Sequence, residues 1–418
     1  MKETNKKHKF DSDLLQILIE RGFVHQTSNE DGLDEYFKSN KTIGYIGFDL
    51  TAKSLHVGSL LQIMLLKWLQ DYGHKPILLL GGGTTLIGDP SGKDETRKIL
   101  LEENIIENEN GIKRVFGKFL DLDEKKLIIE NNKNWLQGLN YISFLREYGK
   151  HFTINRMLTF DSVKIRLERE QPLTFLEFNY MLLQAYDFLE LYRRHDCKLQ
   201  LGGSDQWGNI VNGIELVRRV TSTETYAITT PLITTASGAK MGKTADGAIW
   251  LDEELTSPYD FWQFWRNTDD RDVIRFLKLF TTLPISEIDK LASLEGSEIN
   301  EAKKILANEI TRMTHGSEIS AKIYQSALET FEGKIISQNL PKYQITLGQK
   351  NSMGLLNLLV SIGFAKSNNE ARKAIANGAI KINDVAVLDP NIELKKEDLE
   401  GTKIAFGKKR NLIIEISN

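Results

Sequence analysis

The feature that most constrains the fold is a strand–helix–strand pattern near the N-terminus. Residues 42–48 predict a strand, and Ser54 is a suitable N-cap for a helix whose apolar side chains recur at helical spacing as far as Gly73. Residues 76–80 form a short apolar run before three glycines at 81–83, which is typical of a buried parallel strand. This unit predicts an α/β fold, and open sheets of that kind bind ligands at the carboxyl ends of their strands.

The following segments extend this α/β pattern. Residues 174–195 and 206–220 predict helices, and residues 197–201 and 229–235 predict strands. The intervening residues 99–134 are charged and rich in Asn, so we expect exposed helix and loop there.

Changes of pattern along the chain predict three domains. After about residue 250 the chain becomes helical, and after residue 350 it predicts two short helices followed by short strands. We therefore expect an α/β domain, an α-helical domain, a linker and a small α+β domain over residues 1–250, 251–338, 339–350 and 351–418, respectively.

Composition limits the classes of protein to which the chain can belong. The 418 residues carry a formal net charge of −3, so contact with nucleic acid must come from local basic patches, and we expect no DNA partner. Cys197 is the only cysteine, which excludes an internal disulfide and fits a reducing cytoplasm. We expect no signal peptide, no membrane span and no protein metal site, because no apolar run or metal-ligand spacing supports one.

Two motifs contain residue types that bind phosphate. His56-Val57-Gly58-Ser59 begins the first predicted helix, where free N–H groups suit phosphate. The alternative role of His56 is only to cap a helical turn. Lys240-Met241-Gly242-Lys243-Thr244 places two lysines on a Gly-flanked loop, either to neutralise a leaving pyrophosphate or simply to face solvent. The second motif is not a phosphate loop, because Ser237 stands where that motif needs Gly.

A third motif places three polar side chains on one helix face. Tyr180, Gln184 and Asp187 are separated by four and three residues, which aligns them along the predicted helix. This stripe either binds a small polar ligand or faces solvent.

A fourth motif, Gly202-Gly203-Ser204-Asp205-Gln206-Trp207, joins a predicted strand to a predicted helix. The two glycines allow close approach of a ligand to the backbone, and Asp205 could accept hydrogen bonds from ribose hydroxyls. Capping of the helix by Ser204 or Asp205 is the alternative role.

Together these segments resemble class I aminoacyl-tRNA synthetases, specifically the bacterial-type tyrosyl family. The resemblance covers nearly the whole chain and rests on four quoted blocks, at residues 45–59, 86–92, 180–188 and 202–210. It implies a Rossmann-like, doubly wound parallel-sheet catalytic domain with a dimer-interface insertion, followed by an α-helical anticodon-side domain. It also implies ATP and L-tyrosine as substrates, Mg²⁺ with ATP, tRNA as the acceptor, and a homodimer with Phe175 in the interface region.

The resemblance assigns expected roles residue by residue. The phenol of tyrosine would be held by Tyr45 and Asp187, and the rest of the amino acid by Asp89, Tyr180, Gln184 and Gln206. The residues expected to hold ATP are Gly47, Asp49, His56, Gly58, Gly203, Asp205 and Lys243. Those expected to stabilise the transition state are Thr51, His56, Lys240 and Lys243. One departure is Ser59, which stands where the family often has His.

Residues 352–418 resemble a small RNA-binding module that is shared with a ribosomal protein. Its expected phosphate-contacting face consists of Arg372, Lys373, Lys381, Lys408, Lys409 and Arg410. Two other functions stay open at this point. One is a tryptophanyl-tRNA synthetase, whose amino-acid substrate carries an indole and no phenol. The other is an RNA-binding protein that has kept the synthetase fold without catalysis.

Overall fold

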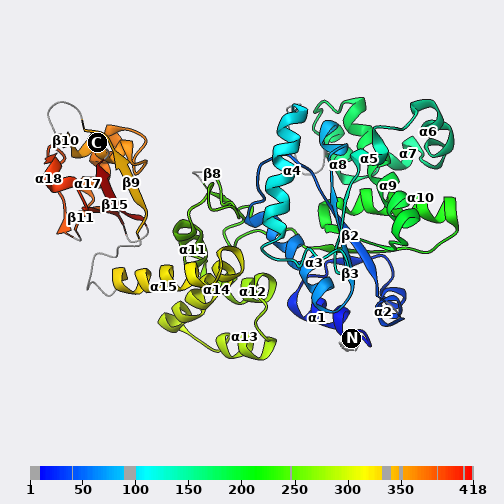
Figure 1. Cartoon of the computed structure of the whole chain (residues 1–418), viewed down its shortest axis with the longest axis horizontal. Coiled ribbons are helices and arrows are strands. Elements are labelled where there is room, and N and C mark those ends of the chain that lie inside the picture. The colour runs from blue at the N-terminus through cyan, green and yellow to red at the C-terminus, as the bar shows by residue number, and fades with distance from the viewer. Residues whose placement is uncertain are drawn as a thin grey trace. The chain divides into compact units, whose positions relative to one another are not determined.

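The computed structural model describes residues 10–39, 41–88, 100–244, 247–331, 340–347, 352–383, 385–407 and 410–416. These residues form two compact units, and Figure 1 shows their elements in order along the chain. The first unit comprises Met1–Leu255 and Thr268–Leu306, and the second comprises Thr256–Asn267 and Ala307–Asn418. Each unit is described separately.

The first unit is built on a six-stranded sheet with the order β1-β6-β5-β2-β3-β4. The five strands from β6 to β4 are parallel, and only the edge strand β1 is antiparallel to its neighbour. In sheet order the strands are Gln26–Thr27, Tyr226–Thr230, Leu199–Gly203, Ile43–Phe48, Lys75–Leu80 and Ile128–Asn131. The α/β fold predicted from the sequence is confirmed.

The strand order reverses beside β2. The chain proceeds from β2 to β3 and β4 on one side and then returns to β5 and β6 on the other. The register pairs Tyr45 with both Ile77 of β3 and Gln200 of β5. Crossover segments diverge at such a point, which leaves a crevice at the carboxyl ends of β2 and β5.

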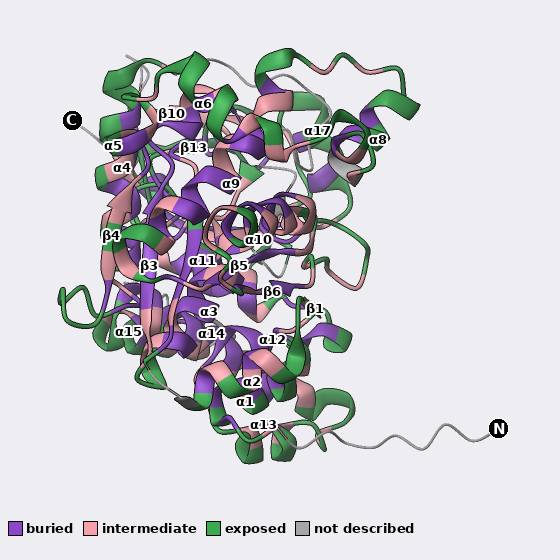
Figure 2. Ribbon diagram, turned by 90° about the vertical axis from the view of Figure 1, so that its right-hand side faces the viewer, coloured by how far each residue is buried: buried purple, intermediate pink, exposed green. Residues whose placement is uncertain are grey.

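Helices cover both faces of this sheet. α9 (Phe175–His195) and α10 (Trp207–Thr221) pack together on one face, where Tyr45 and Phe188 share their core. α3 (Leu60–Asp71) contacts β2, β3 and β5 and also packs against α1 (Asp13–Arg21) and α12 (Asp270–Phe280). The central strands are buried almost throughout, as Figure 2 shows, which explains their continuous apolar sequence.

Several local predictions differ from the structure. Ser54 does not cap the first crossover helix, because its hydroxyl donates to the carbonyl of Leu55 and His56 caps the following 3₁₀ turn, Val57–Ser59. The strand predicted at 229–235 ends at Thr230. Residues 99–134 are not simply exposed helix and loop, because they include α4 (Glu102–Phe116), which buries one face, and the edge strand β4.

A buried arginine ties α1 to the end of α12. The Arg21 guanidinium is 3% exposed and donates hydrogen bonds to the carbonyls of Lys278, Thr281 and Leu283. It also lies over the ring of Trp68, at 4.2 Å from the ring centroid. Burial lowers the pKa of Arg21 to about 10. The carbonyls of Lys278 and Thr281 belong to the negative C-terminal end of α12, which favours a cation.

The second unit contains helices and a separate small sheet. Its helices include α11 (Pro258–Arg266) and α15 (Ser317–Phe331), and the indole of Trp262 donates to Asn308 at 2.7 Å. Its five-stranded sheet has the order β12-β11-β14-β15-β9, with strands Val385–Ala386, Ile380–Ile382, Lys403–Phe406, Arg410–Ile416 and Lys342–Ile345. Two helices, α16 (Leu355–Ser361) and α17 (Asn368–Ala376), share a core with this sheet and precede most of its strands, as predicted. Two strands were not predicted: β10 (Ser352–Gly354) precedes the helices, and β9 lies within the range 339–350 that was expected to be a linker.

Replacing Arg21 tests how much this contact stabilises the first unit. Arg21→Met keeps an apolar chain over Trp68 but removes the donors for three carbonyls. We expect the free energy of unfolding of this unit to fall by about 3 kcal/mol, measured by chemical denaturation followed through tryptophan fluorescence. The control is Lys38→Met, which removes an exposed ion pair with Asp11 and should leave the midpoint unchanged. Equal midpoints for the two variants would contradict the assigned role of Arg21.

Candidate active site at the strand ends

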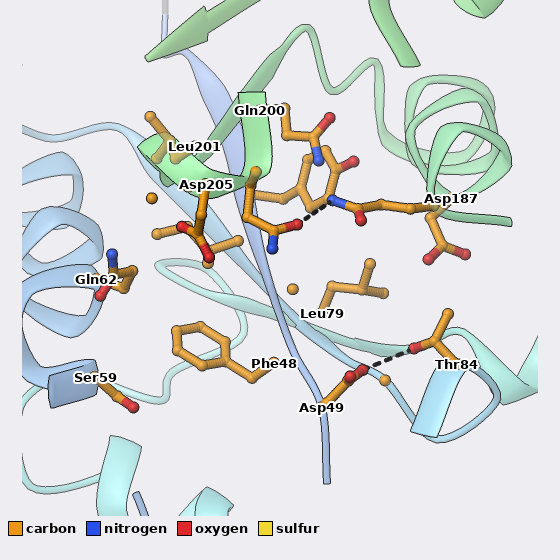
Figure 3. A pocket seen from close by; sticks show the side chains of 18 of the residues that line it. Phe48, Asp49, Ser59, Gln62, Leu79, Thr84, Asp187, Gln200, Leu201 and Asp205 are labelled. Carbon is orange, nitrogen blue, oxygen red and sulfur yellow. Dashed lines mark hydrogen bonds between the residues drawn. The ribbon is translucent and has the colours of Figure 1, made fainter. Parts of the chain in front are cut away.

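A cavity of about 360 Å³ lies at the carboxyl ends of β2 and β5, where the strand order reverses (Figure 3). Its walls come from β2 and the turn that follows it, from α9, and from the segment after β5. The volume is that of a site for a small molecule or a cofactor.

The cavity brings together most of the residues selected from the sequence. The predicted site residues that line it are Tyr45, Gly47, Asp49, Thr51, His56, Gly58, Tyr180, Gln184, Asp187, Gly203, Asp205 and Gln206. Asp89 lies outside the described residues. Tyr180 and Asp187 are buried, so the polar stripe of α9 faces this cavity and not solvent.

The carboxylate of Asp187 forms one end of the cavity. It is 2% exposed and accepts hydrogen bonds from Trp135 Nε1 at 2.7 Å and from Asn132 Nδ2 at 2.9 Å. Burial raises the pKa of Asp187 to about 7, even though both hydrogen bonds favour the ionised form. This carboxyl group is therefore poised between its two protonation states at neutral pH.

Polar atoms beside Asp187 are buried without a hydrogen-bond partner in the described part of the chain. The Tyr45 hydroxyl is one of them, and the Oε1 atoms of Gln184 and Gln200 are two others. Burial and the neighbouring Asp187 raise the pKa of Tyr45 well above its ordinary value, so its hydroxyl stays protonated. Buried polar groups are normally paired, so three such atoms around one cavity indicate a polar ligand.

A chain of hydrogen bonds joins Asp187 to Asp49. Asn132 Nδ2 donates to both Asp187 and the Thr84 hydroxyl, and that hydroxyl donates to Asp49 Oδ1 at 3.1 Å. Figure 3 shows Asp49 and Thr84 at one side of the cavity. The Tyr180 hydroxyl also lies 3.5 Å from Asp49 Oδ1. This network fixes the side chains that separate the two ends of the site.

Several of these residues were missed by sequence reasoning. Asn132 and Trp135 belong to or follow a segment that was predicted to be exposed, and Gln200 lies within a predicted strand. Thr84 followed a glycine run and carried no motif of its own. The nearest available signal was the position of Thr84 and Gln200 at or near strand ends, where open sheets bind ligands.

The His56 turn forms the opposite end of the cavity. His56 Nδ1 accepts a hydrogen bond from the backbone N–H of Gly58 at 2.9 Å, which is the predicted capping role. The neutral ring then carries its proton on Nε2, where it can donate to a phosphate oxygen. Capping and ligand binding are thus compatible. Ser59 also lines the cavity, and its side chain makes no capping bond.

The lysine motif is attached to this turn. Gly242 has a φ of +81°, and a Cβ atom there would lie 2.7 Å from Val57 Cγ2. Val57 N–H also donates to the carbonyl of Ile249. Gly242 and Ile249, which lie on either side of residues 243–248, therefore both contact the His56 turn. Lys240 is exposed and does not line the cavity, and the side chain of Lys243 lies outside the described residues.

The segment after β5 presents its backbone to the cavity. A Cβ atom on Gly203 would lie 2.5 Å from Asp205 Oδ1. A larger residue at position 203 would therefore displace the Asp205 carboxylate. The N-cap of the 3₁₀ turn Ser204–Gln206 is Gly203 and that of α10 is Gln206, and neither cap makes a side-chain hydrogen bond. Gln206 Oε1 accepts from Gln184 Nε2 at 3.3 Å, which joins this segment to α9.

The predicted RNA-contacting cations lie in the second unit. Arg372 and Lys373 are exposed on α17, and Lys381 and Arg410 are exposed on strands. The register pairs Phe406 with Arg410 and Ala405 with Lys381, so these two cations point to opposite faces of the sheet. The four therefore do not share one face. Lys408 and Lys409 lie outside the described residues.

Two further properties hold for the part of the chain that the structure describes. Its acidic, histidine and cysteine side chains form no group of three or more that could hold a metal ion. Its helices include none with the length and apolar character needed to cross a membrane.

Comparisons with known proteins agree with this geometry. Residues 38–332 match the family model described as tRNA synthetases class I (W and Y), and residues 332–414 match that of the tyrosine–tRNA ligase SYY-like C-terminal domain. The chain is 56% identical to the tyrosine–tRNA ligase of Bartonella quintana and 54% identical to that of Bartonella henselae, in each case over 412 residues. Each match covers 97% of this chain and 99% of the relative.

A solved structure is also similar. The C-terminally truncated mitochondrial tyrosyl-tRNA synthetase of Aspergillus nidulans is 30% identical, with a TM-score of 0.69. That match covers 78% of this chain and 96% of the other. The chain therefore belongs to the class I tRNA synthetases and, among them, to the tyrosine–tRNA ligases, which use ATP to join tyrosine to its tRNA.

Proposed function

We propose that the cavity at the ends of β2 and β5 is where this chain activates tyrosine, with Tyr45 and Asp187 recognising the phenol. The observation that carries the proposal is the buried Tyr45 hydroxyl, which lacks a partner in the described part of the chain and stands beside a buried carboxylate. A phenol can accept from Tyr45 and donate to Asp187 at the same time. Tyr180, Gln184 and Asp89 would then bind the ammonium group, and Gln206 would lie near the carboxylate.

The same polar pair favours tyrosine over tryptophan. An indole ring would leave both Tyr45 and Asp187 without the partner that a phenol supplies, which costs binding energy at buried polar groups. Tyrosyl-tRNA synthetases are themselves the usual example of a site that rejects an analogue lacking one hydroxyl. The tyrosine–tRNA ligases similar to this chain support the same choice.

ATP would occupy the end of the cavity formed by the His56 turn and the segment after β5. Gly47, Gly58 and Gly203 permit close approach of the backbone, and Asp49 and Asp205 offer acceptors for hydroxyls or for Mg²⁺-bound water. Thr51, His56, Lys240 and Lys243 would stabilise the charge on the phosphates. Mg²⁺ would arrive with ATP, since it prefers phosphate and carboxylate oxygens.

The chemistry would proceed in two steps. An oxygen of the tyrosine carboxylate attacks the α-phosphorus of ATP, and the bond to the leaving pyrophosphate breaks. A ribose hydroxyl of the terminal adenosine of tRNA then attacks the carbonyl carbon of tyrosyl-adenylate and releases AMP. Both steps depend on positioning and on stabilisation of charge, and neither needs a protein nucleophile. Retention of His56 and Lys240 favours catalysis over a role limited to RNA binding.

The helical segment and the C-terminal module would contact tRNA. We propose domains at residues 1–250, 251–338 and 351–418 and a location in the cytoplasm. The linker at 339–350 would include strand β9, which pairs with β15 of the last domain. Arg372 and Lys373 on α17 are the strongest candidates for phosphate contacts, because both are exposed on one helix that packs on the small sheet. Lys381 and Arg410 would contact RNA only from different faces.

A homodimer would form through an apolar surface beside the active site. Phe175 is 70% exposed and Leu176 is 45% exposed at the start of α9, next to a groove of about 380 Å³ lined by Leu136, Leu139, Phe144 and Leu183. Exposed apolar patches of this kind mark protein interfaces. The same helix carries Tyr180 and Gln184, so the interface would support the wall of the cavity.

Removal of one hydroxyl tests phenol recognition. Tyr45→Phe should lower the preference for tyrosine over phenylalanine by about threefold to tenfold, because a single neutral hydrogen bond is lost. The measurement is the ratio of kcat/KM values in pyrophosphate exchange with the two amino acids. Tyr186→Phe is the matched control, since its hydroxyl donates to Glu190 at 2.9 Å and does not line the cavity. An equal effect of the two substitutions would argue against the assignment.

The pKa of Asp187 predicts a pH dependence for tyrosine binding. The phenol donates a hydrogen bond to the ionised form of Asp187. That form is depleted as the pH falls below about 7, because the carboxyl group takes up a proton. Tyrosine should therefore bind about tenfold more weakly at pH 6 than at pH 8 when ATP is absent. Calorimetry near pH 6 in buffers of different ionisation enthalpy should also show release of nearly one proton on binding. Asp187→Asn should abolish both effects, and their persistence in that variant would assign them to another group.

A charge in the apolar surface tests the homodimer. Phe175→Asp would bury a carboxylate against the partner copy, so the variant should sediment as a monomer where the unmodified protein sediments as a dimer. Ile106→Asp is the control, because Ile106 is 57% exposed on α4 and does not line the groove. A dimeric Phe175→Asp protein would place the interface elsewhere.

A further inference from the structure

Lys240 stands on a hairpin that buries almost none of its own side chains. Met241 N–H donates to the carbonyl of Ile233, and Thr235 N–H donates to that of Ala239, so residues 233–241 fold back on themselves. Gly238 turns the chain at a φ of +83°. Lys240 and the tip of the hairpin are exposed. Packing of the hairpin's side chains is therefore too slight to decide where Lys240 lies.

An ion pair on α12 holds the outgoing arm of this hairpin. Asp272 is 4% exposed, and its Oδ2 accepts from Ala236 N–H at 2.6 Å. Its Oδ1 accepts from Arg275 Nη2 at 2.7 Å, and the same Nη2 donates to the carbonyl of Thr234. The pair thus binds the peptide groups on both sides of Thr235.

The returning arm is held at a second place. Met241 is 6% exposed, and its carbonyl would lie 3.0 Å from a Cβ atom on Gly58. Gly242 packs against Val57 in a conformation that favours glycine. Lys240 therefore lies between an anchor on α12 and an anchor on the His56 turn.

The ion pair between Asp272 and Arg275 is not needed to cap the N-terminus of α12. Asp269 is the N-cap of α12, and its side chain accepts from the backbone N–H of Arg271. At the other end of the helix, Arg21 binds the carbonyls of Lys278 and Thr281. α12 is thus fixed at both ends without Asp272, whose carboxylate oxygens point to Arg275 and the hairpin.

We propose that Asp272 and Arg275 are positioning residues that set the place of Lys240 for adenylate formation. The proposal rests on the role of Lys240 in charge stabilisation that is proposed above. The carboxylate of Asp272 is buried and its hydrogen bonds are short and charge-assisted, so it forms a stiff anchor even though Arg275 is 43% exposed. Misplacement of a stabilising group by about 1 Å can slow catalysis by about a hundredfold.

The experiment combines Asp272→Ala and Lys240→Ala with measurement of the rate of tyrosyl-adenylate formation in a single turnover. Asp272→Ala alone should slow this rate by about tenfold to a hundredfold. Its dissociation constant for tyrosine should stay unchanged, because that end of the cavity does not involve the hairpin. In the Lys240→Ala background, Asp272→Ala should have almost no further effect. Trypsin should also cleave after Lys240 faster in Asp272→Ala than in the unmodified protein.

Two further variants separate positioning from folding. Arg275→Met, at a side chain that is 43% exposed, should reproduce the slow adenylate formation when the rate is measured well below the thermal midpoint of the variant. Asp270→Ala removes a carboxylate from the same turn of α12, where it pairs with Lys303, and should leave the rate unchanged.

The outcomes separate the two proposals. If Lys240→Ala is slow but Asp272→Ala is not, or if the two effects multiply in the double variant, the positioning role is wrong and the role of Lys240 stands. If Lys240→Ala forms adenylate at the normal rate, the proposed role of Lys240 is wrong and the positioning role falls with it.

Discussion

The buried carboxylate of Asp187 is the interaction on which the arrangement of the site depends. A charge at that depth is costly unless other groups donate to it, and the donors Asn132 and Trp135 come from the segment that follows β4. Their hydrogen bonds tie α9 to the far edge of the sheet. Because Asn132 also binds Thr84, the same network reaches the turn after β3 and Asp49. Hydrogen bonds that start at Asp187 thus connect the segments that follow β2, β3 and β4.

The two ends of the cavity use different physical means. At the Asp187 end, polar side chains are buried, so in the proposed function they would discriminate between ligands by the hydrogen bonds that a wrong ligand cannot make. At the His56 end, glycines line the cavity, and the backbone N–H groups there would bind a ligand that carries phosphate. Such a division suits a family that must select one amino acid while handling a nucleotide common to all cells.

The hairpin that carries Lys240 is held by groups at its two arms. Its short polar side chains give little packing, yet buried groups lie at both of its arms: Asp272 on α12 and Met241 against the His56 turn. α12 is itself held by Arg21 and α3. Elements that are distant in sequence therefore converge on a segment that could not hold its own position.

The sequence by itself determined the class of fold and most of the cavity wall. The apolar strands, the helical spacing of Tyr180, Gln184 and Asp187, and the glycines at the end of β5 depend on local geometry, which sequence spacing records directly. Only the tertiary structure decided which groups complete the site. Asn132 and Trp135 carry no local signal, because their roles come from residues that the fold brings beside them. Likewise, strand register separated Lys381 from Arg410, since a shift of one residue along a strand reverses the direction of a side chain.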